Sequence, residues 1–169
     1  MSAAPAAFLD RDGVLIEDCG YPHKPEHLVL IPGAAEAVRR LKSLGYLTVI
    51  VTNQSGVARG LFTEDQMHDF NALLIERLAQ NGGVIDAVYA APYHVDAVIE
   101  RYRHPDHPDR KPNPGMLLRA IEEHGIDPSK SLMIGDQPTD VEAARRAGVA
   151  GHLFKGDNLD AFVQSLTAG

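Results

Sequence analysis

The sequence predicts an α/β fold in which a parallel β-sheet is sandwiched by helices. Short apolar segments alternate along the chain with segments whose apolar residues recur at helical spacing. Glycines close several of the helical segments, as expected just past a helix C-terminus. Polar residues follow the apolar segments directly, and ligands of parallel sheets bind beyond the carboxyl ends of the strands. These polar strand ends are therefore the candidate positions for a functional site.

The first part of the chain alternates between strand and helix patterns. Residues 6–9 form an apolar run that Asp10 stops. Residues 47–51 form an uninterrupted β-rich run, which is typical of a strand buried on both faces. Between these runs, one helical face carries Ala34, Val38, Leu41 and Leu44. Gly45 is expected to end that helix.

The remaining segments continue the alternation. A capping box at Thr63–Gln66 opens a helix that ends at Gly82–Gly83. The further expected strands are residues 85–91, 132–134 and 151–154, and the further expected helices are residues 115–124, 139–147 and 159–166. A long loop rich in proline and histidine, residues 92–114, separates the third strand from the next helix.

Length and charge narrow the classes of function. A chain of 169 residues fits one domain, which we expect to span residues 1–169 and to form a monomer. The formal net charge of −7 argues against nucleic acid or an anionic membrane as a partner bound through bulk charge. Cys19 is the only cysteine, and residues 1–7 lack the basic and apolar stretches of a signal peptide. We therefore expect a cytoplasmic protein.

The first strand ends in two carboxylates. Asp10 and Asp12 are two residues apart, and Gly13 permits a tight turn after them. If the strand continues through Asp12, both side chains lean to one side and can converge on one cation. Mg²⁺ favours one or two protein carboxylates together with water and phosphate oxygens. A solvated turn at a strand end is the alternative that this motif leaves open.

Three further segments carry chemistry that complements these acids. Hydroxyl and amide side chains follow the second strand, namely Thr52, Asn53, Gln54 and Ser55. Arg110 and Lys111 place two cations together in an acidic chain, and Asp136 and Asp140 follow the strand at 132–134. Separately, these segments could be a polar turn, a solvated basic pair and a helix cap. Together they supply what phosphoryl transfer requires: a nucleophile, a metal site and positive groups around the phosphoryl oxygens.

The four segments, in this order, resemble the motifs of the haloacid dehalogenase (HAD) superfamily of phosphatases. The matching residues are Asp10-Arg11-Asp12-Gly13, Thr52, Lys111, and Asp136 with Asp140. The resemblance spans residues 8 to about 154. It implies a HAD-like fold with a Rossmann-like parallel sheet. The segments between the motifs are too short to form a separate cap domain, so we expect a capless enzyme.

The resemblance also implies a mechanism. Asp10 would be the nucleophile that forms an aspartyl-phosphate, and Asp12 would protonate the leaving oxygen and then deprotonate the hydrolytic water. Thr52 and Lys111 would hold the transferring phosphoryl group. The implied ligands of Mg²⁺ are Asp10, Asp12 through its backbone carbonyl, and Asp136, with Asp140 in support.

Longer stretches are similar to the heptose 1,7-bisphosphate phosphatases and histidinol-phosphatases within the superfamily. These stretches are residues 8–13, 20–21, 52–60, 110–112 and 114–116. They imply a small phosphorylated metabolite as substrate, namely a sugar phosphate or bisphosphate, with histidinol phosphate as the alternative. The implied contacts to the rest of the substrate are Asn53, Gln54, Ser55, Arg59, Arg110 and the Asp18–Tyr21 loop.

Two other classes of function remain open at this point. A non-catalytic phosphate-binding protein could keep the fold, but it would need neither the nucleophile Asp10 nor the acid/base Asp12. A phosphomutase would need a large cap to protect the aspartyl-phosphate from water, and the segments between the motifs provide none.

The chain departs from the subfamily in the 92–114 loop and beside two motifs. Family members hold a structural zinc in this loop through cysteine and histidine, but the matching positions here are Ala91, Tyr93, His107 and Asp109. We therefore expect no structural zinc, because thiolates contribute much of the affinity of such sites. The alternative is a rebuilt metal site made of His94, His104, His107 and Asp109. Val14 and Gln137 replace the threonine and lysine usual beside the motifs, which leaves the substrate open.

Overall fold

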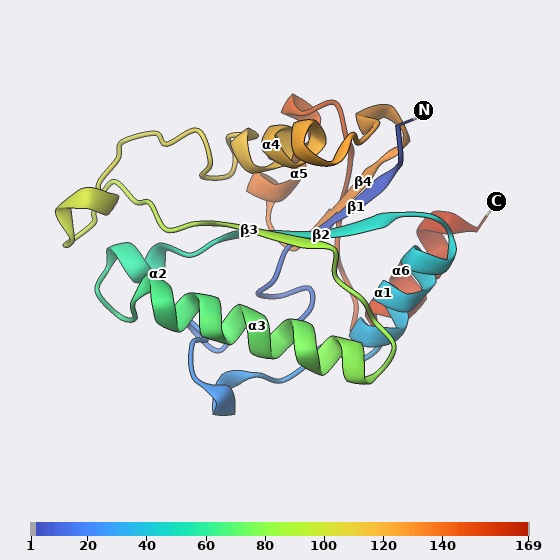
Figure 1. Cartoon of the computed structure of the whole chain (residues 1–169), viewed down its shortest axis with the longest axis horizontal. Coiled ribbons are helices and arrows are strands. Elements are labelled where there is room, and N and C mark those ends of the chain that lie inside the picture. The colour runs from blue at the N-terminus through green and yellow to red at the C-terminus, as the bar shows by residue number, and fades with distance from the viewer. Residues whose placement is uncertain (1–2, 169) are drawn as a thin grey trace.

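Five parallel strands form one sheet with the order β3-β2-β1-β4-β5 in a computed structural model that describes residues 3–168 (Figure 1). The strands are β1 (Ala6–Leu9), β2 (Leu47–Asn53), β3 (Ala87–Ala91), β4 (Leu132–Gly135) and β5 (Ala150–Leu153). The chain runs outward from β1 to β3 and then returns to the other side of β1 with β4. The strand order therefore reverses between β1 and β4, the position at which such sheets bind ligands.

Helices cover both faces of the sheet, as predicted. They are α1 (Ala34–Ser43), α2 (Ser55–Ala58), α3 (Glu64–Gln80), α4 (Gly115–His124), α5 (Pro138–Arg146) and α6 (Leu159–Thr167), with short 3₁₀ turns at Pro25–His27, Glu100–Tyr102 and Pro128–Lys130. In Figure 1, α4 and α5 lie on one side of the sheet, and α1, α3 and α6 lie on the other. Within residues 3–168, the segments between strands form these helices and loops, and none builds a cap domain.

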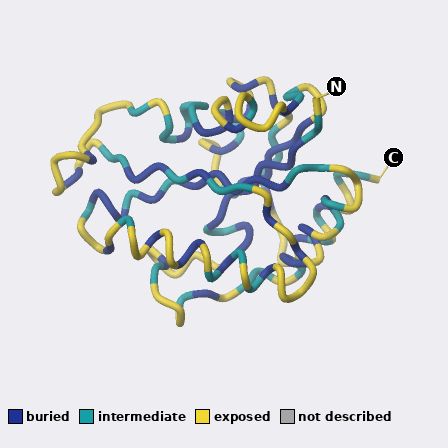
Figure 2. The backbone as a smooth tube through the Cα atoms, viewed as in Figure 1, coloured by how far each residue is buried: buried dark blue, intermediate teal, exposed yellow. Residues whose placement is uncertain are grey.

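Alternate residues of the strands face the two helical layers. Ala7 and Leu9 of β1 pack in the cluster that includes α1, α3 and α6, whereas Ala6 and Phe8 pack in the cluster with α4 and α5. The strands β1, β2 and β4 are accordingly buried along most of their length, whereas the edge strands β3 and β5 are more exposed (Figure 2). This explains the uninterrupted apolar runs in the sequence, because both faces of the central strands exclude water.

Local signals predicted the helix ends well, with one correction. Thr63 and Gln66 form the predicted capping box at the start of α3, with hydrogen bonds of 3.1 and 2.9 Å. Leu44, which we expected on the buried face of the first helix, is instead the residue after its last turn and is 51% exposed. No helix in the described part of the chain is both long and apolar enough to cross a membrane.

The 92–114 loop projects away from β3, at the left of Figure 1. Its three histidines each accept a hydrogen bond at Nδ1 from the backbone N–H two residues later, at 3.0 to 3.1 Å. The Tyr93 and His107 rings also stack, with centroids 3.5 Å apart. In the described residues, His94, His104, His107 and Asp109 do not gather into a potential metal site. The absence of structural zinc stays a prediction, for elemental analysis of untagged protein to test.

Candidate active site

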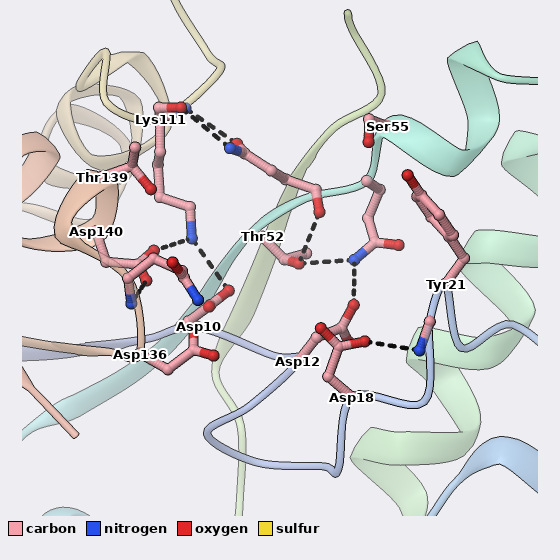
Figure 3. Close-up of a pocket in the computed structure, with 14 residues that line it drawn as sticks. Asp10, Asp12, Asp18, Tyr21, Thr52, Ser55, Lys111, Asp136, Thr139 and Asp140 are labelled. Atoms are coloured by element: carbon pink, nitrogen blue, oxygen red, sulfur yellow. Dashed lines mark hydrogen bonds and ion pairs between the residues drawn. The ribbon is translucent and has the colours of Figure 1, made fainter. Parts of the chain in front are cut away.

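A cavity of about 400 Å³ lies at the carboxyl ends of β1, β2 and β4. Most of the predicted site residues line it: Asp10, Asp12, Asp18, Tyr21, Thr52, Asn53, Gln54, Ser55, Lys111, Asp136 and Asp140. In Figure 3, the Lys111 side chain points toward Asp10 and Asp140, and Thr52 and Asp12 lie across the cavity from them. Gly20, Gln137 and Thr139 complete the lining. Thr139 was missed, although its place between Asp136 and Asp140 in the sequence could have indicated it.

Asp10 directly follows β1 and is 8% exposed. Its backbone N–H donates to the carbonyl of Ile134 at 3.0 Å, which keeps it in line with β4. The Asp10 Oδ1 atom accepts hydrogen bonds from the Arg11 N–H at 2.9 Å and from Lys111 Nζ at 3.1 Å. Burial raises the pKa of Asp10 well above its usual range, Lys111 opposes the shift, and Asp140 adds to it.

Among the described residues that line the cavity, Lys111 is the only one with a positively charged side chain. It is 3% exposed, and its ammonium group donates to Asp10 Oδ1 at 3.1 Å, Asp140 Oδ1 at 2.5 Å and the Val51 carbonyl at 2.9 Å. An ammonium group has three N–H donors, so each has an acceptor. Burial works against its charge, but Asp10 and Asp140 outweigh that effect and raise the pKa of Lys111.

The side chain of Asn53 fixes the loop that carries Lys111. Its Nδ2 atom donates to the Lys111 carbonyl at 3.1 Å, and its Oδ1 atom accepts from the Lys111 N–H at 3.0 Å. Both ends of the amide are thus engaged by the backbone of one residue. The predicted phosphate contact of Asn53 stays a prediction, but these two bonds already give it a role in placing Lys111.

Three carboxylates converge beside the ammonium group. Asp10, Asp136 and Asp140 each place an oxygen within 4.8 Å of the others. Two glycines make this approach possible, because a Cβ atom at Gly13 would collide with Asp136 and one at Gly135 would collide with Asp140. Gly13 also has a φ of +88°, which other residues rarely adopt.

The charge of this group fits a divalent cation. Burial raises the pKa of Asp136 as well as that of Asp10, and the charge of Asp140 adds to both shifts. The ionised cluster therefore holds more negative charge than Lys111 compensates. Hard oxygen donors without thiolates are the donor set that Mg²⁺ prefers.

Asp140 combines two functions that the sequence left as alternatives. Its Oδ2 atom accepts the N–H of Gln137 at 3.0 Å, in the capping box of α5. Its Oδ1 atom accepts from Lys111. The helix start therefore holds Asp140 in the orientation that pairs with the buried ammonium group.

The side chain of Asp12 diverges from the carboxylate group, which corrects the expectation that Asp10 and Asp12 converge on one cation. The strand does not continue through Asp12, because β1 ends at Leu9. Arg11 Nε donates to Asp12 Oδ1 at 2.6 Å, and Arg11 Nη2 donates to Oδ2 at 3.2 Å. The Asp12 side chain is 21% exposed and lines the cavity, so it can still reach a leaving group.

Arg11, which supports the site without lining the cavity, is a second residue whose role the sequence analysis missed. It stands between two acids of the first motif and is fully buried. Besides Asp12, it donates to Asn71, Gln54 and the Pro22 carbonyl at 2.9 to 3.1 Å. No local signal indicated these partners, since they come from segments up to 60 residues away.

Arg59 and Arg110 are not among the residues that line the cavity. Arg59 Nη2 lies 3.1 Å from His94 Nε2, and Arg110 donates to the Tyr93 carbonyl at 3.2 Å. Burial, with the nearby charge of Arg59, lowers the pKa of Arg110. The two guanidinium groups thus form a basic pair beyond the cavity, and their contact with a substrate stays a prediction.

Comparison with known proteins agrees with this geometry. The model of the haloacid dehalogenase-like hydrolases matches residues 6–148. The chain belongs to this family. The match includes every residue of the carboxylate group and Lys111.

Individual members of the family are similar over most of their length. A D-glycero-beta-D-manno-heptose-1,7-bisphosphate 7-phosphatase from Rhodopseudomonas palustris is 43% identical over 163 residues, covering 96% of this chain and 89% of that protein. A HAD-like phosphatase from Mesorhizobium loti has a crystal structure with a TM-score of 0.87 and 41% identity, covering 92% of this chain and 75% of that one. The D,D-heptose 1,7-bisphosphate phosphatase of B. bronchiseptica, crystallised with magnesium and phosphate, has a TM-score of 0.79 and 30% identity, covering 97% and 87%.

Proposed function

We propose that this chain is a Mg²⁺-dependent phosphatase that hydrolyses a small sugar phosphate or bisphosphate of the heptose 1,7-bisphosphate type. One observation carries the proposal: Asp10 stands buried at the end of β1 against Lys111, within a group of carboxylates suited to a divalent cation. The heptose bisphosphate phosphatases that the chain resembles over 96% and 97% of its length support the substrate class. An intact nucleophile and acid/base pair favours catalysis over simple binding.

Asp10 is the nucleophile of the proposed reaction. Both hydrogen bonds that the described residues donate to its side chain end on Oδ1, so Oδ2 is the atom that attacks phosphorus. The attack forms an aspartyl-phosphate and releases the sugar oxygen, which takes a proton from Asp12. Asp12 then takes a proton from the water that hydrolyses the aspartyl-phosphate.

The transferring phosphoryl group is held by Thr52 and Lys111. A phosphoryl oxygen accepts from the ammonium group in place of one of its present carboxylate partners. Asp10, Asp136 and the Asp12 carbonyl are the residues that would hold Mg²⁺, with Asp140 in support. When bound, the metal supplies the positive charge that allows an anionic nucleophile to approach an anionic phosphate.

The size and charge of the cavity favour a small substrate. About 400 Å³ holds a phosphorylated sugar, and the net charge of −7 opposes binding of nucleic acid. The basic pair Arg59 and Arg110 lies beyond the cavity, where a second phosphate of a bisphosphate would find positive charge.

The proposal is tested by kcat/KM across phosphorylated sugars, histidinol phosphate, a phosphopeptide and a 5′-phosphorylated oligonucleotide, with Mg²⁺ present. The expected result is a preference for a sugar phosphate or bisphosphate, lost in Asp10→Asn. A preference for the peptide or the oligonucleotide would contradict the substrate class, and turnover by Asp10→Asn would contradict the site.

A further inference from the structure

A chain of hydrogen bonds runs from Arg11 through Gln54 to Thr52 at the edge of the cavity (Figure 3 shows its last step). Arg11 Nη2 donates to Gln54 Oε1 at 3.0 Å, and Gln54 Nε2 donates to Thr52 Oγ1 at 2.8 Å. Gln54 is 3% exposed, and Arg11 is fully buried. This series of hydrogen bonds therefore lies inside the protein and ends at Thr52, which lines the cavity.

The direction of these bonds is fixed by the chemistry of arginine. A guanidinium group only donates hydrogen bonds, so the atom of Gln54 that faces Arg11 must be the amide oxygen. The amide nitrogen then faces Thr52, and the Thr52 oxygen must accept from it. The buried charge of Arg11 thus sets the orientation of the Gln54 amide, and the amide sets the role of the hydroxyl group.

The hydroxyl proton of Thr52 is left available to the cavity. Among the described residues, the acceptor it reaches is the carbonyl of Asn53 at 3.5 Å, at the outer limit of hydrogen-bond length. An ionised phosphoryl group offers only acceptors. The Thr52 hydroxyl group already accepts a hydrogen bond from Gln54, and its proton is free. It can therefore donate to a phosphoryl oxygen.

We infer that Gln54 is a positioning residue that holds the Thr52 hydroxyl group as a hydrogen-bond donor to the transferring phosphoryl group. The inference rests on the proposed role of Thr52. It differs from the sequence prediction that Gln54 contacts the substrate, because both polar atoms of its amide have partners inside the protein. The Gln54 amide also lies 3.5 Å from Asp12 Oδ2, so one side chain links the phosphate-holding and proton-transferring residues.

The test is a double-mutant cycle of Gln54→Met with Thr52→Val. Methionine keeps the length of the side chain and removes both hydrogen bonds. We expect Gln54→Met to lower kcat/KM about tenfold and to weaken orthophosphate binding to the Mg²⁺-loaded protein by a similar factor, as for loss of one aligned hydrogen bond to a charged group. In the Thr52→Val background, Gln54→Met should change kcat/KM and orthophosphate binding less than about twofold each. The hydroxyl group through which Gln54 acts is already absent from that background.

A second variant tests the direction of the bond. The carboxylate of Gln54→Glu still accepts from Arg11 but cannot donate to Thr52, so the hydroxyl proton turns toward it and away from the cavity. We expect this variant to bind orthophosphate more weakly than Gln54→Met does. In the Thr52→Val background the difference between Glu and Met should shrink, whereas a difference that persists unchanged would overturn the inference.

Asn71 provides the matched control. It accepts from Arg11 Nη1 at 2.9 Å and is also 3% exposed, but it does not line the cavity. Asn71→Leu removes a partner of Arg11 but leaves the Gln54 amide with both of its hydrogen bonds, so it should change thermal stability and couple to Thr52→Val less than Gln54→Met does in either assay. If the effects of Gln54→Met and Thr52→Val multiply independently, Gln54 acts by another route and the inference is wrong. If the wild-type protein is inactive on every substrate, the proposed function is contradicted. The orthophosphate titration then still measures the coupling between Gln54 and Thr52.

Discussion

Lys111 Nζ lies 2.5 Å from Asp140 Oδ1, and both side chains are 2% exposed. The pair joins the loop after β3 to the first turn of α5, 29 residues later in the chain. A buried ion pair contributes little when whole, but removal of one partner leaves an uncompensated charge. Lys111, for which we propose a role in phosphate binding, is therefore also part of what holds the strand ends together.

Lys111→Met is expected to lower both activity and stability. The lost cation should reduce kcat/KM by about 10²-fold or more. The free energy of unfolding in chelator should fall by about 3 kcal/mol, because Asp10 and Asp140 stay buried without a cation. Urea denaturation with and without Mg²⁺ measures the free energy of unfolding. The decrease caused by Lys111→Met should be smaller when the metal is present. Arg145→Met, at an exposed ion pair, is the control and should leave both quantities unchanged. Equal stability of Lys111→Met and wild type in chelator would contradict this account.

Asp10→Asn should abolish turnover while leaving the fold at least as stable. Asparagine keeps the size of the side chain but cannot form the acyl phosphate. Burial already opposes the charge of Asp10, so the neutral side chain removes an unfavourable charge from the metal-free protein. Thermal unfolding in chelator, together with a turnover assay, checks both parts. A variant that melts well below the wild type would show that the Asp10 charge stabilises the fold.

Mg²⁺ should stabilise the wild-type protein through the carboxylate group. A ligand that binds only the folded state raises the melting temperature with its concentration. We expect this rise in the wild type and its loss in Asp136→Asn, together with loss of activity in EDTA that Mg²⁺ restores. Asp127→Asn, at the start of the 3₁₀ turn at Pro128–Lys130 and away from the cavity, should keep the full metal response. Full activity of metal-free protein, verified by elemental analysis, would exclude the proposed role of the metal.

The 92–114 loop should loosen at acid pH. Burial lowers the pKa of His94 and His107 below the ordinary histidine value, so the unfolded loop binds protons more readily than the folded one. Their stabilising contribution is complete above the unfolded pKa of about 6.5 and is lost as the pH falls through it toward the folded value. Protonation also removes the lone pair with which each Nδ1 accepts a backbone N–H. Hydrogen exchange of the loop at pH 5 and pH 7.5 checks this, with α3 as the internal reference. Equal protection of the loop at both pH values would show that these bonds do not hold it.

Sequence patterns predicted the structural features that depend on residues close together along the chain. The capping box of α3 and the buried β2 run are local signals, and both are present in the structure. The orientation of Asp12 could not be predicted, because it depends on Arg11, whose own orientation depends on Asn71 and Gln54 from other segments. The position of Leu44 depended on where the last helical turn ended, which periodicity alone does not fix.

The Asn53 side-chain amide pairs with the N–H and C=O groups of Lys111 in the way that a residue of a neighbouring β-strand would. These hydrogen bonds join a strand end to a loop 58 residues later in the chain. If the loop slipped by one residue, Pro112 would replace Lys111 opposite Asn53, and proline has no N–H to donate. If it slipped the other way, Arg110 would replace Lys111 opposite Asn53, and a guanidinium group would take the place of the ammonium group. A single amide side chain thus fixes the position along the loop at which Lys111 faces the carboxylates.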